Sequence, residues 1–370
     1  MNRERQAESL VKEIEQRLGR QLQMPLRNAF LQVPRHLFIN HYYRQQGNRL
    51  AWDRIEPPAL EDMYRDQALV TKIDGRGLPI SSSSQPSVMA RQLELLDLRS
   101  GLRVLEIGTG TGYNAALMGR IIAPAGQVIS IDIDPELLAT AIRHLNAADI
   151  SNVLVTKGDG FLGNPEHAPY DRILATCAVR SISWPWIEQL APGGILLVNL
   201  RLNLSSVFLC LKKLAPARLE GNIFDLDAAY MEMHRAGDVP QSLRVDWSLY
   251  DSQPRHTVQL LANLAELLMH PAYSLLLECL LPSLRKKYRA FPETDEVHTY
   301  LIDASVPGSA ILVQGDRAIV IDDQGYLEER LLQSLEWYER LELRMEDYRV
   351  SLDEAGVTLS AGEISFALES

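Results

Sequence analysis

Between residues 87 and 200, short apolar runs rich in β-branched residues alternate with amphipathic helical patterns, and this alternation restricts the fold more than any other feature. The strand-like runs lie at 103–107, 127–132, 152–156, 171–176 and 194–200. The helical patterns lie at 87–97, 113–122, 135–147 and 184–190. Alternation of this kind predicts a Rossmann-like, doubly wound α/β fold with a mostly parallel sheet. Two later runs, 205–214 and 224–233, predict strands that close the sheet with an antiparallel edge.

The flanking regions predict additional parts of the molecule. Before the alternating segment we expect helices over 3–22 and 26–31, then an irregular aromatic segment to about residue 80. The turn-rich stretch Arg235–Pro240 predicts a boundary, and after it we expect a helical stretch at 256–287, a β pair at 310–321, a helix at 326–341 and strands from Tyr348. The expected parts are an N-terminal helical cap and substrate-side segment at 1–80, a ligand-binding α/β domain at 81–236 and a smaller α+β domain at 241–370.

The composition is that of a globular protein, with 46% hydrophobic and 23% charged residues. The formal net charge is −11, with the excess of acid after residue 240, which argues against binding nucleic acid over a wide face. The N-terminus has no apolar signal core, and the apolar stretch Leu260–Leu284 is interrupted by Glu266 and Glu278. We therefore expect a cytoplasmic protein that does not engage a membrane.

Cysteines and histidines are not spaced as metal ligands. Cys177, Cys210 and Cys279 are far apart and form no CxxC pattern, so we expect reduced thiols. His36 and His41 have no carboxylate or cysteine partner at ligand spacing, and no metal site is expected. A nucleophilic role for Cys177 is disfavoured because no base is evident nearby.

A glycine-rich loop follows the first strand of the predicted sheet, in the sequence VLEIGTGTGY at 104–113. Gly108, Gly110 and Gly112 stand where the loop must turn sharply and where a ligand would lie against bare backbone. The next helix begins directly after the loop, so its N-terminus would point at the same ligand.

Three interpretations of this loop remain open: a methyl-donor site, a dinucleotide site and a purely structural turn. The dinucleotide pattern G-x-G-x-x-A fits from Gly110 to Ala115, but the same spacing counted from Gly108 would require glycine or alanine where Tyr113 stands. Glu106 would attract the amino group of a cationic sulfonium ligand and repel a pyrophosphate. The sequence therefore favours S-adenosylmethionine over a dinucleotide.

Acidic residues follow the next two strands. Asp132 ends the second strand roughly 20 residues after the loop, where an acid is expected to meet ribose hydroxyls. Asp134, followed by Pro135, is better interpreted as a helix N-cap. Asp159 follows the third strand and could accept from an adenine amino group while Phe161 packs on the ring; a plain turn would explain both residues as well.

With these residues in place, the chain resembles the protein-L-isoaspartate O-methyltransferase family. The resemblance extends over about residues 25–234. Its matching stretches are VPRHLF at 33–38, YRDQAL at 64–69, ISSSSQPSVM at 80–89, the glycine loop, GDGFLG at 158–163, APYDRI at 168–173 and QLAPGG at 189–194.

The resemblance implies methyl transfer from S-adenosylmethionine to a carboxylate of an aspartate-derived residue in a peptide or protein. The catalytic residues that it implies are Ser83 and Ser84. The residues that it implies around the donor are Gln85, Pro86, Met89, Glu106, Gly108, Thr109, Gly110, Gly112, Asn114, Asp132, Ile133, Asp159, Gly160, Phe161 and Thr176.

The chain departs from the family pattern in two ways. The serine run at 81–84 is longer than the usual single serine, and about 130 residues follow the catalytic region. Both departures resemble the branch that acts on ribosomally made peptides, in which an aspartate is esterified and closes to aspartimide. The alternatives are general repair of isoaspartyl damage and a peptide-binding homologue without turnover.

The chemistry needs no general base, because a carboxylate with an ordinary pKa near ~4 is already ionised at neutral pH. Opposite charges approach and cancel in alkyl transfer from a sulfonium, so placement of the reactants and exclusion of water supply the acceleration. Serine hydroxyls can hold the carboxylate without neutralising it, whereas arginine or lysine would pair with it too strongly. A polar loop is the alternative interpretation, above all for Ser81 and Ser82.

Overall fold

A computed structural model describes residues 3–47, 51–226, 228, 230–234, 245–291, 293–294, 296–321 and 325–368. The chain divides into two compact units, which we treat separately. The first comprises Met1–Asn199, Leu209–Leu219 and Leu226–Asp238, and the second comprises Leu200–Phe208, Glu220–Asp225 and Val239–Ser370. Within the described residues, no helix is long and apolar enough to span a bilayer.

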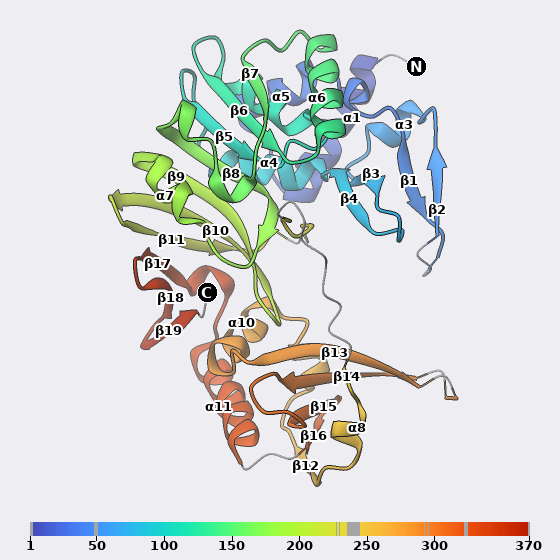
Figure 1. Ribbon diagram of the computed structural model, residues 1–370, viewed down its shortest axis with the longest axis vertical. Helices are drawn as coiled ribbons and strands as arrows, with labels where there is room; N and C mark the ends of the chain where they lie inside the picture. Colours follow the sequence, from blue (N-terminus) through green and yellow to red (C-terminus); the bar gives the residue numbers. More distant parts are fainter. Residues whose placement is uncertain are drawn as a thin grey trace. The chain divides into compact units, whose positions relative to one another are not determined.

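The first unit contains the expected parallel sheet. Strands β5 (Arg103–Ile107), β6 (Gln127–Asp132), β7 (Val153–Lys157) and β8 (Tyr170–Val179) pair in parallel in the order β8-β5-β6-β7. The helices that accompany them are α4 (Pro86–Leu95), α5 (Tyr113–Ile122), α6 (Pro135–Ala147) and α7 (Trp184–Gln189) (Figure 1). Residues 104–107 of β5 are buried, as in a parallel sheet covered on both faces. The predicted fold class is confirmed.

The late strands of the sheet are β9 (Leu190–Arg201), β10 (Ser206–Ala215) and β11 (Arg218–Phe224), which neighbour one another in that order. The prediction of a strand over 224–233 was wrong, because only two residues separate β10 from β11 and pairing resumes as soon as the chain reverses. Residues 230–234 instead lie beside the end of β8. There Ala178 N donates to Met231 O, and Met233 N donates to Ala178 O. The predicted boundary at 235–240 lies outside the described residues.

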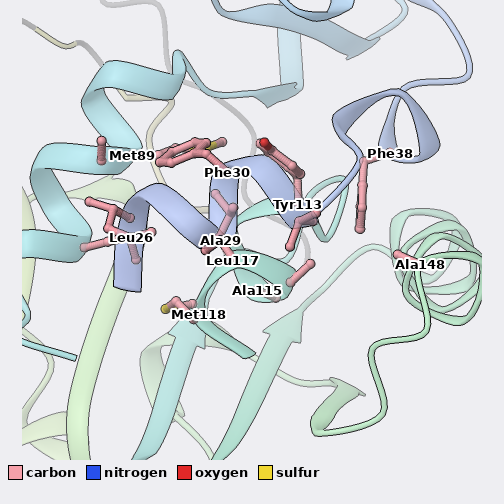
Figure 2. Packing of buried hydrophobic residues seen from close by; sticks show 14 of the residues in the cluster. Leu26, Ala29, Phe30, Phe38, Met89, Tyr113, Ala115, Leu117, Met118 and Ala148 are labelled. Carbon is pink, nitrogen blue, oxygen red and sulfur yellow. The ribbon is translucent and has the colours of Figure 1, made fainter. Parts of the chain in front are cut away.

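The N-terminal helices α1 (Arg3–Leu18) and α2 (Met24–Gln32) belong to the same unit as the sheet and share its core. Phe30 of α2 and Phe38 of the 3-10 turn η1 (Arg35–Phe38) pack on Tyr113, with ring centroids 6.5 and 5.4 Å apart (Figure 2). Tyr113 is 1% exposed. The residue that follows the glycine loop is therefore fixed by the N-terminal helices.

The segment expected to be irregular forms a second sheet. Strands β1 (Tyr42–Gln45), β2 (Trp52–Ile55), β3 (Leu69–Ile73) and β4 (Pro79–Ser83) lie in the order β2-β1-β3-β4, with the short helix α3 (Leu60–Met63) between β2 and β3. These strands were missed because they are short and half-exposed, with burial that does not alternate regularly along them. The last strand, β4, carries the serine run.

The second unit contains a five-stranded sheet and a three-stranded meander. The sheet has the order β12-β16-β15-β14-β13, formed by β12 (Arg255–Gln259), β13 (Leu284–Phe291), β14 (Glu296–Asp303), β15 (Ala310–Gln314) and β16 (Arg317–Ile321). The meander consists of β17 (Arg349–Asp353), β18 (Gly356–Ala361) and β19 (Ile364–Leu368). The helices are α8 (Ser248–Asp251), α9 (Leu264–Leu267), α10 (Pro271–Leu280) and α11 (Tyr326–Leu341).

The predicted β pair at 310–321, the helix at 326–341 and the late strands are confirmed in this unit. The predicted helical stretch at 256–287 is confirmed only in its middle, where α9 and α10 form a helical pair, and its two ends are strands instead. Residues 255–259 pair with β16, and β13 pairs with β14 along its whole length. Long-range pairing therefore overrides the helical spacing of the leucines in this stretch.

Candidate functional site

A cavity of about 330 Å³ lies at the carboxyl edge of the parallel sheet in the first unit. Its walls come from β4, the middle of α4, the glycine loop after β5, the ends of β6 and β8, and residues 230–234. Ligands of open α/β sheets bind at this edge. Among the described residues, the lining contains no lysine or arginine, whereas it includes the acidic residues Asp132, Asp134 and Glu232.

The glycine loop is shaped by contacts that only glycine permits. Gly108 has a φ of +98°, and a Cβ there would lie 2.6 Å from Thr176 Oγ1. Gly112 has a φ of +83° and precedes α5, where a Cβ would lie 3.1 Å from the Cβ of Ala141. The left-handed backbone and the crowding together exclude a side chain at both positions. The loop therefore presents bare backbone to the cavity.

The buried side chain of Glu106 holds the glycine loop through hydrogen bonds. Its carboxylate accepts hydrogen bonds from Asn114 Nδ2 at 2.8 Å and from Ser130 Oγ at 2.6 Å, and Thr109 Oγ1 lies 2.7 Å from the same serine oxygen. Burial raises the pKa of Glu106 to about 7, although these hydrogen bonds oppose the rise. The carboxylate is not part of the cavity lining. In this structure it joins β5, β6 and α5 beneath the loop, so direct contact with a ligand's amino group remains a prediction.

The side chain of Asp132 is hydrogen-bonded to the backbone of the glycine loop. Its Oδ2 accepts from Gly110 N at 3.1 Å and its Oδ1 accepts from Asp134 N at 3.1 Å, and the residue lines the cavity. The N-cap prediction for Asp134 is confirmed, since its carboxylate accepts from Glu136 N and Leu137 N at the start of α6. Lys72 Nζ lies 2.6 Å from the same carboxylate. Partial burial acts to raise the pKa of Asp134, but these partners hold it below its usual value.

The third loop of the sheet contributes less than the sequence predicts. Asp159 is the N-cap of the 3-10 turn η2 (Gly160–Leu162) and accepts from Phe161 N at 2.9 Å. Neither Asp159 nor Phe161 lines the cavity, whereas Gly160 does. A Cβ on Gly160 would lie 2.7 Å from Met233 Sδ and 2.8 Å from Ile107 Cγ2. The backbone of Gly160 therefore approaches the cavity because it has no side chain.

Three of the four serines at 81–84 belong to the cavity lining. Ser81, Ser82 and Ser84 line the cavity, whereas Ser83 is 1% exposed and lies 3.4 Å from Arg35 Nη2. Ser83 is thus placed against a buried cation, and the structure does not bring it to the cavity. Ser84 remains the expected residue on the acceptor side.

The expected residues that line the cavity are Ser84, Met89, Gly108, Thr109, Gly110, Asn114, Asp132, Ile133, Gly160 and Thr176. The expected residues that do not line it are Ser83, Gln85, Pro86, Glu106, Gly112, Asp159 and Phe161. Residues that do not line the cavity can still contact residues that do, as Glu106 does by accepting a hydrogen bond from Asn114.

Cys177 lines the cavity beside Thr176, but sequence reasoning missed the wall formed by Gln92 and residues 230–234. Tyr230 donates its hydroxyl to Gln92 Oε1 at 2.7 Å, and the same side chain is hydrogen-bonded to Ser84. Burial raises the pKa of Tyr230, so its hydroxyl stays protonated and remains a donor. No local signal identifies this wall, because Tyr230 and Gln92 are 138 positions apart.

Burial raises the pKa of Cys177 to about 12. Its thiol therefore stays protonated at neutral pH, in agreement with the expectation that it is not a nucleophile.

A family model described as protein-L-isoaspartate(D-aspartate) O-methyltransferase matches residues 5–225. The chain belongs to this family. Its members use S-adenosylmethionine, in agreement with the expected donor. The match covers the first unit's sheets and helices up to β11 and stops before most of the second unit.

Curated relatives carry the same name. The chain is 39% identical over 177 residues to a protein-L-isoaspartate O-methyltransferase of Thermotoga maritima, which covers 48% of this chain and 50% of that protein. It is 36% identical over 201 residues to one from Methanothrix thermoacetophila, covering 54% and 80% of the two chains. The chain thus spans half the length of the Thermotoga relative.

A solved protein-L-isoaspartate O-methyltransferase is similar over nearly the whole molecule, with a TM-score of 0.57 and 25% identity over 96% of this chain and 99% of that one. A region after the methyltransferase sheet is therefore not by itself a mark of the peptide-tailoring branch.

Proposed function

We propose that this chain transfers the methyl group of S-adenosylmethionine to the carboxylate of an isoaspartyl residue in a peptide or protein. The observation that carries the proposal is the cavity lining, which has Asp132 and Asp134 at one wall, serines and Tyr230 with Glu232 at another and, among the described residues, no lysine or arginine. Such a lining suits a cationic sulfonium and would repel a pyrophosphate. Membership of the isoaspartyl methyltransferase family supports the same reaction.

On the donor side, Asp132 would hold the ribose hydroxyls and the backbone of Gly108 and Gly110 would lie against the ligand. Glu106 does not line the cavity itself, and its bonds to Asn114 and Ser130 keep the loop in this conformation. Thr176 contributes too, since its hydroxyl donates to Gly108 O at 2.7 Å.

On the acceptor side, Ser84 and Tyr230 are the hydroxyl groups that would hold the substrate carboxylate, and Tyr230 would turn its single proton from Gln92 Oε1 to the carboxylate. Neither neutralises it, so the carboxylate keeps its negative charge and remains nucleophilic. One carboxylate oxygen forms a bond to the methyl carbon as the carbon–sulfur bond breaks, and S-adenosylhomocysteine leaves as a neutral thioether. Because opposite charges cancel in this step, a water-excluding cavity favours it.

The narrower alternative is methylation of one aspartate in a ribosomally made peptide, followed by closure to aspartimide. The long serine run on β4 and the second unit support it. Its weight is reduced by the solved isoaspartyl methyltransferase that is similar over 96% of this chain. A peptide-binding homologue without turnover is the third alternative.

The test is incubation of the chain with methyl-labelled donor and short linear peptides of unrelated sequence, each made with isoaspartate and with aspartate. Base-labile label on the isoaspartyl peptides alone supports the proposal and contradicts the tailoring alternative. If neither kind of peptide is labelled although the chain binds S-adenosylhomocysteine in a calorimeter, the proposal is overturned. The tailoring enzyme and the binding homologue without turnover are then the remaining alternatives.

Two variants assign the sides of the cavity. Asp132→Ala should weaken S-adenosylhomocysteine binding, whereas Asp171→Ala, which removes a carboxylate that accepts from Arg103 N at the start of β5, should not. Ser84→Ala should lower kcat at saturating donor, and Ser100→Ala, whose hydroxyl donates to Ala123 O, is its matched control. Equal effects of a variant and its control would remove the assigned role.

A further inference from the structure

Two stretches that carry the family resemblance, 33–38 and 64–69, contribute no residue to the cavity. Each of them nevertheless contains one charged residue whose side chain reaches the segment that carries Ser84. These residues are Arg35, in η1, and Asp66, in the turn before β3.

Arg35 is a fully buried cation whose partners are uncharged oxygen atoms. Its guanidinium donates to Arg65 O at 2.8 Å, to Gln67 O at 3.0 Å and to Ser84 O at 3.3 Å. Its exposure is 0%, and its Nε has no partner. Burial lowers the pKa of Arg35 to about 10, which leaves it charged at neutral pH. A buried charge is expensive, and an arginine supplies a rigid fork of donors that can fix several carbonyl groups at once.

Asp66 supplies the cap that α4 lacks. The N-cap residue Gln85 makes no side-chain cap bond, and the Asp66 carboxylate instead accepts from Ser87 N at 2.7 Å and from Gln85 Nε2 at 3.1 Å. The Asp66 side chain is 7% exposed, and its backbone N–H donates to Glu13 Oε2 of α1 at 2.9 Å. A carboxylate at a helix N-terminus stabilises the free N–H groups there.

The two residues hold the chain at Ser84 and directly after it. Arg35 fixes the carbonyl group of Ser84, and Asp66 fixes two residues that follow directly at the start of α4. Because Arg35 also holds the carbonyl groups on either side of Asp66, the two side chains form one unit, which we name the Arg35–Asp66 clamp.

We propose that the Arg35–Asp66 clamp positions Ser84 for methyl transfer, so that turnover depends on two residues that do not touch the cavity. This inference rests on the proposed acceptor-side role of Ser84. A displacement of about 1 Å at a reacting group can cost roughly 100-fold in rate, which sets the scale of the expected effect.

The experiment compares Arg35→Met and Asp66→Ala with Lys213→Met in the full chain. Lys213 is the matched control, because it is a 7% exposed cation that donates to Ile187 O and Leu190 O, outside the cavity lining. Calorimetric titration with S-adenosylhomocysteine counts folded sites, and kcat on an isoaspartyl peptide is expressed per site. We expect a fall of about 10- to 100-fold per site in both clamp variants and a change under about 3-fold in the control.

The conservative variant Asp66→Asn should restore most of the rate, because its amide oxygen still accepts from Ser87 N. Hydrogen exchange gives a readout that needs no activity: residues 81–87 should exchange faster in the clamp variants and not in Lys213→Met. If Arg35→Met does not fold, the comparison of Asp66→Ala with Asp66→Asn tests the inference instead.

Wild-type rates per site in folded clamp variants, with unchanged exchange at 81–87, would overturn the inference and leave the clamp a purely structural role. Failure of the proposed function is distinct, because it would show as an inactive wild-type chain. Faster exchange at 81–87 in the clamp variants would then still support positioning of that segment.

Discussion

Replacement of Gly108 by alanine tests whether the glycine loop is fixed by contact with β8. Gly108 has a φ of +98°, and a Cβ would lie 2.6 Å from Thr176 Oγ1. The threonine cannot rotate away freely, since its hydroxyl donates to Gly108 O at 2.7 Å and lies 3.0 Å from Ile107 O. The strain of the left-handed backbone and the crowding against Thr176 should therefore both lower the unfolding free energy of Gly108→Ala.

The backbone cost can be measured at a second glycine. Gly101 has a φ of +89°, and a Cβ added there would have no neighbour within 4 Å, so Gly101→Ala should lose only the roughly 1–2 kcal/mol of the left-handed conformation. Crowding in a packed interior costs about 1–3 kcal/mol more. We expect Gly108→Ala to lose about 2–5 kcal/mol of unfolding free energy, that is about 1–3 kcal/mol more than Gly101→Ala.

The assay is urea unfolding of both variants, followed by calorimetric titration of the folded proteins with S-adenosylhomocysteine. A loop displaced by one lost contact of about 1.4 kcal/mol binds roughly tenfold more weakly. The double variant Gly108→Ala/Thr176→Ala should recover the crowding part of the stability loss. Equal losses in Gly108→Ala and Gly101→Ala would refute the reasoning.

Three further variants test other parts of the first unit. Tyr230→Phe removes the hydroxyl that donates to Gln92 at 2.7 Å, and kcat/KM on an isoaspartyl peptide should fall about 2- to 10-fold. Tyr170→Phe, which removes the hydroxyl of a buried ring at the start of β8, is the control and should keep wild-type kinetics. Burial raises the pKa of Glu106 from 4.5 to about 7, so the folded state keeps a proton that the unfolded state releases. Its contribution to stability is full below pH 4.5 and is lost as the pH rises through about 7. Glu106→Gln should therefore remove about 2–3 kcal/mol of the decline in unfolding free energy between about pH 5 and about pH 8, and parallel pH profiles would contradict this. Lys72→Met removes two part-exposed ion pairs of 2.6 and 2.7 Å and should change unfolding free energy by less than about 1 kcal/mol, so a loss above about 2 kcal/mol would be inconsistent.

The position of the proposed donor side at one edge of the sheet could be predicted from the sequence because each of its parts is local. Gly108 and Asp132 each lie at the end of a buried strand, and parallel strands bring their carboxyl ends to one edge. The N-cap role of Asp134 also follows from its neighbours alone, since the next residue is a proline at the first helical position.

The acceptor side could not be predicted in the same way, because it depends on pairing between distant segments. Tyr230 reaches the cavity through contacts of residues 231–233 with Ala178, and the sequence pattern wrongly predicted a strand there. Ser83 and Ser84 are neighbours with the same side chain, yet one faces Arg35 and the other faces the cavity. Only the register of β4 and the turn after it determines which of the two serines lines the cavity.

The two sides of the cavity therefore depend on different kinds of constraint. The donor side is held by the glycine loop and the buried Glu106, where even one added carbon meets a neighbour. The acceptor side is assembled from β4, α4 and residues 230–234, and Glu232 there is 31% exposed and paired with Arg180. Because a part-exposed residue such as Glu232 tolerates substitution better than a packed loop, changes at Glu232 should alter the choice of acceptor while leaving donor affinity intact. Under the proposed function, the substrate would be selected where the sequence signal is weakest and the donor where it is strongest.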